Sequence, residues 1–156
     1  MGRECHAKSA RNKSRATDVV QVELSLRSAI SEISPLIDRL MLLIRTGYCV
    51  VGEEINIEIA LREAITNAVL HGNKADPEKR VTICCEFGLG TGASVIVRDE
   101  GQGFDPANVV DPTTTENIES DHGRGLYLMR ALMEEVHFEQ GGTEVHMRKG
   151  FRPKST

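Results

Sequence analysis

Three polar residues recur at four-residue spacing in the middle of the chain, namely Glu63, Asn67 and His71. In a helix, residues four apart lie on one side about one turn from each other, so a carboxylate, an amide oxygen and an imidazole share a face. Mg²⁺ prefers hard oxygen ligands and retains waters and substrate phosphates, so the Asn67 amide oxygen is a candidate metal ligand. Glu63 is then placed to orient or deprotonate an attacking hydroxyl. On this helix alone, a solvated polar face explains the residues better, and other motifs must decide.

A second candidate site begins at Asp99, which follows a run of β-branched residues and precedes the segment EGQGFDP. At a strand end, the Asp99 carboxylate stands beside a loop that can fold closely over a ligand. A carboxylate only accepts hydrogen bonds, as the amino group of adenine requires. Gly101 and Gly103 let the backbone pack against a flat base or sugar. A plain turn explains this spacing equally well.

A third candidate site lies where a polar loop gives way to a helical pattern, over His122, Gly123, Arg124, Gly125 and Leu126. Free backbone N–H groups at a helix N-terminus bind phosphate, and the glycines let them approach it. Arg124 either adds positive charge beside the phosphates or points to solvent. The chain has no Gly-x-x-x-x-Gly-Lys-Ser/Thr segment, so the phosphate loop of the commonest nucleotide-binding proteins is excluded.

Two periods of apolar residues indicate the elements that position these motifs. Period-two alternation and β-rich composition predict strands, whereas three- or four-residue spacing predicts helices. The glycine-rich residues 88–92 lie between two predicted strands, so they are interpreted as a hairpin connection rather than a phosphate loop. The predicted strands are residues 19–26, 80–87, 93–98, 135–140 and 143–149, and the predicted helices are residues 35–46, 52–71 and a segment that begins at Gly125.

The order of these elements predicts the fold class. Helices that lie between antiparallel strand pairs favour an α+β, two-layer α/β sandwich, with a mixed, mostly antiparallel sheet of about five strands and about three helices on one face. Residues 106–121 are polar and turn-rich, so we expect them to form a mobile lid. The residues expected to face the core are Val20, Val22, Leu24 and Leu26 in the first strand, Leu36, Ile37, Leu40, Leu43 and Ile44 in the first helix, and Ile57, Leu61, Ala64 and Ala68 in the second.

Length and composition bound the remaining possibilities. The 156 residues suit one ordinary domain, and we expect a basic disordered tail at 1–17, a single domain at 18–150 and a short C-terminal tail at 151–156. A net charge of −4, few aromatic residues and no Trp argue against nucleic-acid binding. The chain lacks both a long apolar run and a secretory signal, so we expect no membrane contact and a cytoplasmic location. The four cysteines are expected to be reduced thiols.

In order along the chain, the segments EAITNAVLHGN (63–73), DEGQGFDP (99–106) and HGRGLYLM (122–129) closely resemble the three nucleotide boxes of the GHKL ATPases, and in detail those of the anti-sigma-factor serine kinases. The resemblance covers residues 19–149 and implies the left-handed Bergerat ATP-binding fold, with ATP and Mg²⁺ bound. It puts Asn67 on Mg²⁺, Asp99 on the adenine, Glu63 in the place of the general base and residues 106–121 in the place of the ATP lid. The other nucleotide contacts that it implies are His71, Gly101, Gly103, Phe104, Gly123, Arg124, Gly125 and Leu126.

The same resemblance implies an ATP-dependent serine/threonine protein kinase that phosphorylates a small, STAS-like anti-anti-sigma partner and sequesters a sigma factor. It also implies a homodimer, for which the first helix and the adjoining sheet edge are the expected contact surface. Histidine kinases of the superfamily use a separate helical domain, for which this chain has no heptad pattern. Two alternatives stay open: a regulatory binding module whose ATP pocket controls partner affinity with little phosphotransfer, and a stand-alone ATPase in which Glu63 activates water.

Overall fold

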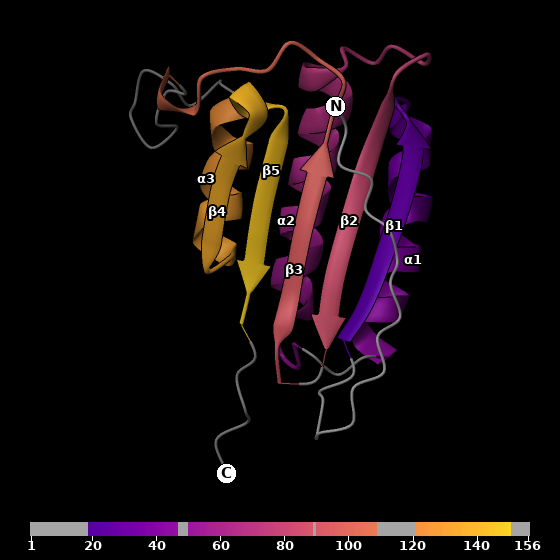
Figure 1. Ribbon diagram of the computed structural model, residues 1–156, viewed down its shortest axis with the longest axis vertical. Helices are drawn as coiled ribbons and strands as arrows, with labels where there is room; N and C mark the ends of the chain where they lie inside the picture. Colours follow the sequence, from indigo (N-terminus) through magenta and orange to yellow (C-terminus); the bar gives the residue numbers. More distant parts are fainter. Residues whose placement is uncertain (1–18, 47–49, 89, 109–120, 151–156) are drawn as a thin grey trace.

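The structure is a computed structural model that describes residues 19–46, 50–88, 90–108 and 121–150. Its described strands form one five-stranded sheet in the order β1-β2-β3-β5-β4, with β1 and β4 at the edges (Figure 1). Every pairing between the described strands is antiparallel. Strands β3 and β4, which α3 connects, therefore run parallel with β5 between them. The strands are β1 (Val19–Arg27), β2 (Arg80–Gly88), β3 (Gly92–Arg98), β4 (Glu135–Glu139) and β5 (Glu144–Lys149).

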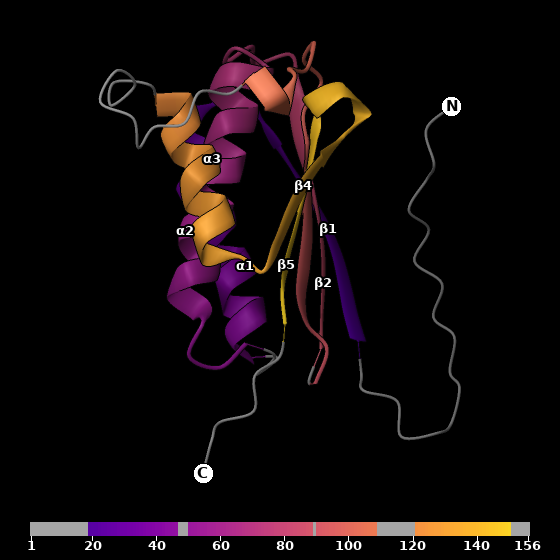
Figure 2. The same cartoon turned by 90° about the vertical axis from the view of Figure 1, so that its left-hand side faces the viewer.

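Three helices in the described part of the chain cover one face of this sheet (Figure 2). Within the described ranges the opposite face of the sheet carries no helix, so these elements form two layers and the predicted fold class is confirmed. None of the described helices has the length and hydropathy that a membrane span requires. The helices are α1 (Ile33–Thr46), α2 (Glu54–Asn67) and α3 (Asp121–Leu132), with shorter turns at η1 (Ile30–Glu32), η2 (Ala68–Gly72), η3 (Pro106–Asn108) and η4 (Gln140–Gly142).

The strand register explains how the alternating sequence builds the core. Leu24 lies opposite Ile83 across the β1–β2 ladder, and Leu26 lies opposite Val81. Residues paired in this way point to the same face, so the predicted apolar row of β1 lies on the helix side of the sheet. Leu26 is buried, whereas Val20 is 45 % exposed because β1 is an edge strand.

One predicted core position in α1 is wrong. Leu43 is 37 % exposed, and Met41 takes a place in the core instead, with 1 % of its surface exposed. Consecutive helical residues are about 100° apart, so Leu43 lies to one side of the buried stripe that contains Leu40 and Ile44. The other predicted core residues of this helix, Leu36, Ile37, Leu40 and Ile44, are buried.

The bounds of the other two helices also differ from the predictions. The α-helical part of α2 ends at Asn67, and η2 continues it as a π turn in which the Asn73 N–H donates to the Ala68 carbonyl at 2.8 Å. Helix α3 begins at Asp121, four residues before the predicted start at Gly125. Two glycines at 123 and 125 hide the helical period, which explains the late prediction.

Several predictions fall on residues outside the described ranges. These are the basic tail at 1–17, the tail at 151–156, most of the expected lid at 109–120, and the thiols of Cys5 and Cys49. The two described cysteines are free thiols, as predicted. They point to opposite faces of β2: Cys85 is buried among the core residues and Cys84 lies half-buried on the other face.

Candidate active site

A cavity of about 230 Å³ opens between the sheet and helices α2 and α3. The volume lies below the range of about 300–1,000 Å³ that is typical of sites for whole drug-sized ligands, so the cavity suits one flat ring system such as a purine base. All three sequence motifs contribute to its walls. The lining comprises the predicted residues Asn67, His71, Asp99, Gly103, Phe104 and Leu126, together with Ala64, Ala68, Gly72, Val97, Met129, Phe138, Gly142, Thr143 and Val145.

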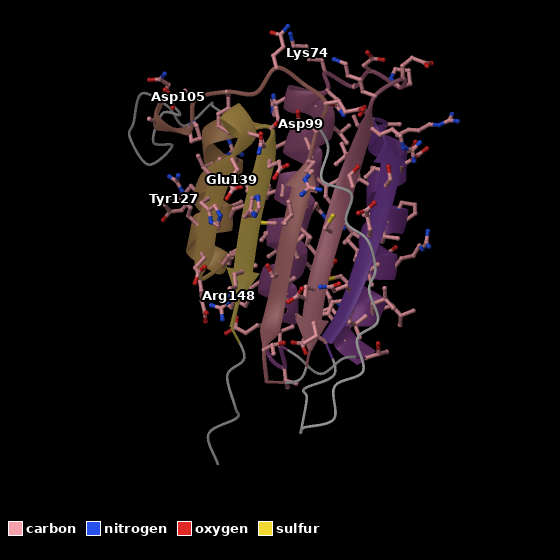
Figure 3. All side chains as sticks on the ribbon, viewed as in Figure 1. Lys74, Asp99, Asp105, Tyr127, Glu139 and Arg148 are labelled. Atoms are coloured by element: carbon pink, nitrogen blue, oxygen red, sulfur yellow. The ribbon has the colours of Figure 1, made fainter. Side chains whose placement is uncertain are left out.

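Asp99 follows β3 directly and lies near one end of the sheet (Figure 3). Its backbone N–H donates to the Thr143 carbonyl at 2.9 Å, which continues the β3–β5 ladder by one bond. Its side chain accepts a hydrogen bond from the Gly101 N–H at 2.8 Å. Burial raises the pKa of Asp99 above its ordinary value of 3.8, while the Gly101 N–H and the positive charge of Lys79 oppose the rise. Asp99 therefore offers a partly desolvated acceptor to the cavity.

Glycines let the backbone close around this carboxylate. A Cβ atom at Gly72 would overlap the Asp99 carboxylate, and a Cβ atom at Gly101 would overlap the Gly72 carbonyl oxygen. Any larger residue at either position would push Asp99 or the end of η2 out of place. The spacing of Asp99 and Gly101 thus reflects a close packing of the loop on η2, which is a stronger requirement than a plain turn.

The opposite rim of the cavity is built in the same way from the segment before β5. Gly103 and Gly142 have φ angles of +77° and +91°, which favour glycine. A Cβ atom at Gly103 would overlap the Gly141 carbonyl oxygen, to which the Phe104 N–H donates at 2.9 Å. The Phe104 ring then packs edge-on against Phe138, with 5.1 Å between the ring centroids.

Asn73 fastens the base of the site and was not among the predicted site residues. Its side chain is fully buried, and its Nδ2 donates to the Ser28 hydroxyl at 2.7 Å and to the Arg80 carbonyl at 2.9 Å. Its Oδ1 accepts the Glu100 N–H at 2.7 Å. One amide therefore connects the end of β1, the start of β2 and the loop that carries Asp99, which makes Asn73 a positioning residue.

Glu63 and Asn67 both point from α2 toward α3 and meet it at Gly125. A Cβ atom at Gly125 would lie 2.8 Å from Glu63 Oε2 and 3.1 Å from Asn67 Nδ2. Neither side chain has a hydrogen-bond partner elsewhere in the described residues. Two half-buried polar groups without partners form a place for an incoming polar ligand, since unpaired polar groups at such depth are costly.

The remaining predicted residues occupy the first turn of α3. Gly123 is buried and Arg124 is exposed, and neither lines the cavity. Because α3 begins at Asp121, the N–H groups of its first four residues lack partners within the helix, and Gly125 is not one of these residues. The role predicted for the Gly125 N–H stays a prediction, whereas its lack of a side chain makes room for Glu63 and Asn67.

Sequence reasoning also missed several lining residues, among them Phe138, Gly142 and Thr143. Residues 141 and 142 lie between the predicted strands 135–140 and 143–149, where the local pattern indicates only a connection between strands. The signal that could have found it is a pair of glycines followed directly by a strand that neighbours the Asp99 strand. That neighbourhood is a long-range pairing of β3 with β5, and local patterns do not reveal it.

The arrangement has an acceptor for a purine amino group at one end and a carboxylate beside an amide at the other. The flat cavity fits a base, because glycines remove side chains from both rims. The Asn67 amide supplies the neutral oxygen that Mg²⁺ accepts as a ligand, and the Glu63 carboxylate next to it is a hydrogen-bond acceptor without a partner. The residues present therefore fit a magnesium nucleotide.

The chain matches the family described as "Histidine kinase-like ATPase domain" over residues 15–149. It is 39 % identical over 113 residues to the protein named Serine-protein kinase RsbW of Bacillus subtilis, and the match covers 67 % of this chain and 69 % of that protein. It is 34 % identical over 105 residues to the protein named Anti-sigma F factor of Geobacillus stearothermophilus, with 64 % of this chain and 71 % of that protein covered. A Serine-protein kinase RsbW of Staphylococcus epidermidis is 31 % identical over 100 residues, with 59 % and 62 % covered.

The family match extends over nearly all described residues and includes all three motifs around the cavity. The chain spans about two thirds of the length of the curated relatives that it matches. Both findings agree with the resemblance that the three motifs indicated. This chain belongs to the histidine kinase-like (GHKL) ATPase domain family, in its group of anti-sigma-factor serine/threonine protein kinases.

Proposed function

We propose that this chain transfers the γ-phosphoryl group of ATP to a serine or threonine of a small, STAS-like anti-anti-sigma protein, and that it sequesters a sigma factor. The names of the relatives, a serine-protein kinase and an anti-sigma factor, support both activities. The observation that carries the proposal is the placement of Glu63 and Asn67 side by side against Gly125, with Asn67 lining a base-sized cavity. We place this activity in the cytoplasm.

In this proposal, Asp99 holds the base. Its carboxylate accepts a hydrogen bond from the adenine amino group, while the rims around Gly101 and Gly103 hold the ring between two stretches of backbone. A guanine would present a carbonyl oxygen in place of the amino group, and two acceptors facing each other repel. The site is therefore expected to prefer ATP over GTP.

Glu63 is the general base of the proposed transfer. The hydroxyl oxygen of the substrate serine or threonine forms a bond to the γ-phosphorus, and the bond from this phosphorus to the bridging oxygen breaks, which releases ADP. The hydroxyl proton passes to the Glu63 carboxylate. Asn67 would hold Mg²⁺, which supplies positive charge to the phosphates. Gly123, Arg124 and Gly125 lie in the first turns of α3, and we propose that these turns lie beside the phosphates.

The contacts with other proteins are also proposals. We propose a homodimer that uses α1 and the free edge of β1, because Leu42 and Leu43 of α1 and Val19 and Val20 of β1 are large apolar residues with between 37 % and 64 % of their surface exposed. An edge strand with unpaired backbone groups and an apolar helix face beside it offers both hydrogen bonds and apolar area to a second copy.

Calorimetry and phosphotransfer with matched variants test the proposal. Wild type is expected to bind Mg-ATP, Asn67→Ala to lose the magnesium-dependent part of the binding, and Glu63→Gln to bind ATP but to transfer no phosphate to a candidate anti-anti-sigma protein. Glu58→Gln is the control, since Glu58 is a half-exposed carboxylate of the same helix that pairs with Arg45 outside the cavity. Absence of ATP binding by wild type would overturn the proposal.

The same experiment separates the alternatives. A regulatory binding module would bind Mg-ATP and change its affinity for a partner without labelling it. A stand-alone ATPase would release phosphate steadily without a protein acceptor, and the Glu63→Gln variant would stop that release. The presence of both Glu63 and Asn67 beside Gly125 favours phosphotransfer, because a module that only bound nucleotide has no use for the carboxylate.

A further inference from the structure

A cluster of two histidines and two glutamates lies on the face of the sheet opposite the helices, over the β4–β5 hairpin. His137 of β4 and His146 of β5 are directly opposite each other in the register, and their rings stack with 4.9 Å between centroids and 17° between planes. Glu139 lies on the same face two residues after His137, and Figure 3 shows it in front of the sheet, away from the helices. The nucleotide cavity lies on the other face of the same strands, so the cluster plays no part in the proposed kinase site.

The spacing of the donor atoms in this cluster fits the first coordination shell of a small transition-metal ion. Glu139 Oε1 lies 3.3 Å from His137 Nε2, and Glu139 Oε2 lies 3.5 Å from His146 Nε2. Ligand bonds of about 2.0–2.1 Å in a tetrahedral zinc site set the ligand atoms roughly 3.3 Å apart. One donor atom from each of the three residues lies within 4.8 Å of the other two, so only small side-chain rotations are needed.

We propose that His137, Glu139 and His146 bind a divalent transition-metal ion, with Zn²⁺ as the representative. Two imidazoles and one carboxylate are the donor set of many zinc sites, in which water completes the coordination. Imidazole favours zinc, nickel and copper, whereas Mg²⁺ and Ca²⁺ select oxygen ligands. The site is therefore chemically distinct from the magnesium position proposed at Asn67.

Glu144 supports the proposed site from the neighbouring row of the sheet. Its Oε2 lies 3.0 Å from His146 Nε2, and its Oε1 accepts a hydrogen bond from Arg98 Nε at 2.7 Å. Only 15 % of the Glu144 side chain is exposed, so its position is well fixed. Because this contact is to Nε2, the nitrogen that would bind the ion, Glu144 does not orient the ring through the opposite nitrogen; its carboxylate adds negative charge directly beside the ion.

The ion would join the two strands that form one wall of the cavity. Phe138 lies between His137 and Glu139 along β4, and Val145 lies between Glu144 and His146 along β5; both line the cavity from the opposite face. Strand β4 is an edge strand whose sheet partner is β5. A metal that holds the two strands together would therefore stabilise the hairpin and, through it, the base-binding wall.

The test is calorimetric titration of the nucleotide-free full chain with Zn²⁺ under reducing conditions, in a buffer without chelating groups. Glu139→Gln and Glu135→Gln form a matched pair, because both are exposed glutamates on the same face of β4, and Glu135 pairs with Arg148 instead of the histidines. We expect Glu139→Gln to weaken Zn²⁺ binding at least about 10-fold. Glu135→Gln is expected to bind as wild type does, and the double variant His137→Gln, His146→Gln to lose this site.

Two controls distinguish Zn²⁺ binding by the histidines from binding by a nearby thiol and from misfolding of a variant. Cys84→Ser removes a half-exposed thiol of the same sheet face and is expected to leave the histidine-dependent binding unchanged. Thermal unfolding with and without Zn²⁺ gives an independent readout, because an ion that binds the folded state raises Tm in wild type and Glu135→Gln but not in the double-histidine variant. Equal Zn²⁺ affinity of Glu139→Gln and Glu135→Gln, or undiminished binding by the double-histidine variant, would overturn the inference.

Discussion

Replacing Gly125 by alanine perturbs the proposed active site through one methyl group. The new Cβ atom would lie 2.8 Å from Glu63 Oε2 and 3.1 Å from Asn67 Nδ2. Ordinary van der Waals contacts of a Cβ atom begin near 3.4 Å, so the Glu63 carboxylate must move by about 0.6 Å and the Asn67 amide by about 0.3 Å. Both groups are the ends of flexible side chains, so the backbone of α2 and α3 can stay in place.

The two expected effects of this change have opposite signs. Misplacement of a reacting group by about 1 Å costs roughly 100-fold in rate, so a shift of this size is expected to lower the phosphotransfer rate constant about 10- to 100-fold. Alanine within a helix is more favourable than glycine by roughly 0.5–1 kcal/mol, which offsets the strain of moving the two side chains. The free energy of unfolding is therefore expected to change by less than about 1 kcal/mol.

Three measurements on Gly125→Ala separate these effects: urea unfolding, ATP binding by calorimetry, and single-turnover transfer from labelled ATP to a candidate anti-anti-sigma protein. Glu63→Gln serves as the reference for complete loss of the base. Wild-type transfer by a folded Gly125→Ala variant would refute the conclusion that this contact positions Glu63. A loss of several kcal/mol in stability would refute the expectation that flexible side chains absorb the methyl group.

Two substitutions and one labelling reaction test the roles of Asp99, Lys149 and the two described cysteines. Asp99→Asn is expected to weaken ATP binding about 10- to 100-fold, because a hydrogen bond to a charged group contributes about 1.5–3 kcal/mol. Unchanged ATP affinity in calorimetry would show that Asp99 does not bind the base. Burial raises the pKa of Asp99 above 3.8 in the folded state, so the contribution of Asp99 to stability is present below pH 3.8 and is lost as the pH rises through the folded-state pKa. Asp99→Asn does not titrate. In urea unfolding without ligand, its stability relative to wild type should therefore rise over this pH window, and a fall would contradict the raised pKa. Burial and the neighbouring Cys84 raise the pKa of the Cys85 thiol to about 12. Iodoacetamide at neutral pH is therefore expected to label Cys84 before Cys85. Fragmentation mass spectrometry that found Cys85 labelled before Cys84 would contradict the burial of Cys85. Lys149 is buried, and its Nζ lies 3.1 Å from Glu53 Oε2, so Lys149→Met leaves the Glu53 carboxylate without this ion pair. The free energy of unfolding is expected to fall by about 3 kcal/mol. A loss below about 1 kcal/mol in urea unfolding would show that Glu53 finds other partners.

Much of the fold follows from apolar periods in the sequence. The alternation of Val22, Leu24 and Leu26 predicts the buried face of β1, and the register with β2 places those residues opposite the core residues of that strand. The glycine-rich connection between β2 and β3 is a hairpin because strands lie on both sides of it. Each of these features depends on neighbours in sequence, and local patterns are informative about them.

The candidate site could be predicted only in part. The three motifs contain Asn67, Asp99 and Gly125. No motif alone predicts a nucleotide site, and only the resemblance of all three to known nucleotide boxes predicts that they form one site. Asn73 and Thr143 could not be found, because their roles are hydrogen bonds to segments far away in the sequence. Such contacts arise from tertiary packing, which no window of local residues encodes.

The two ends of the site are held by different parts of the fold, and this separates binding from transfer. Asp99 is fixed by the sheet, through its N–H bond to Thr143, and by the loop that Asn73 fastens. Glu63 is fixed by the pair of helices that meet at Gly125. A nucleotide that spans both ends depends on the distance between the sheet and the helix pair. Changes at the sheet end should therefore act on ATP affinity, whereas changes at the helix contact should act on the rate of transfer at full occupancy, so the two sets of variants can be told apart by kinetics at saturating ATP.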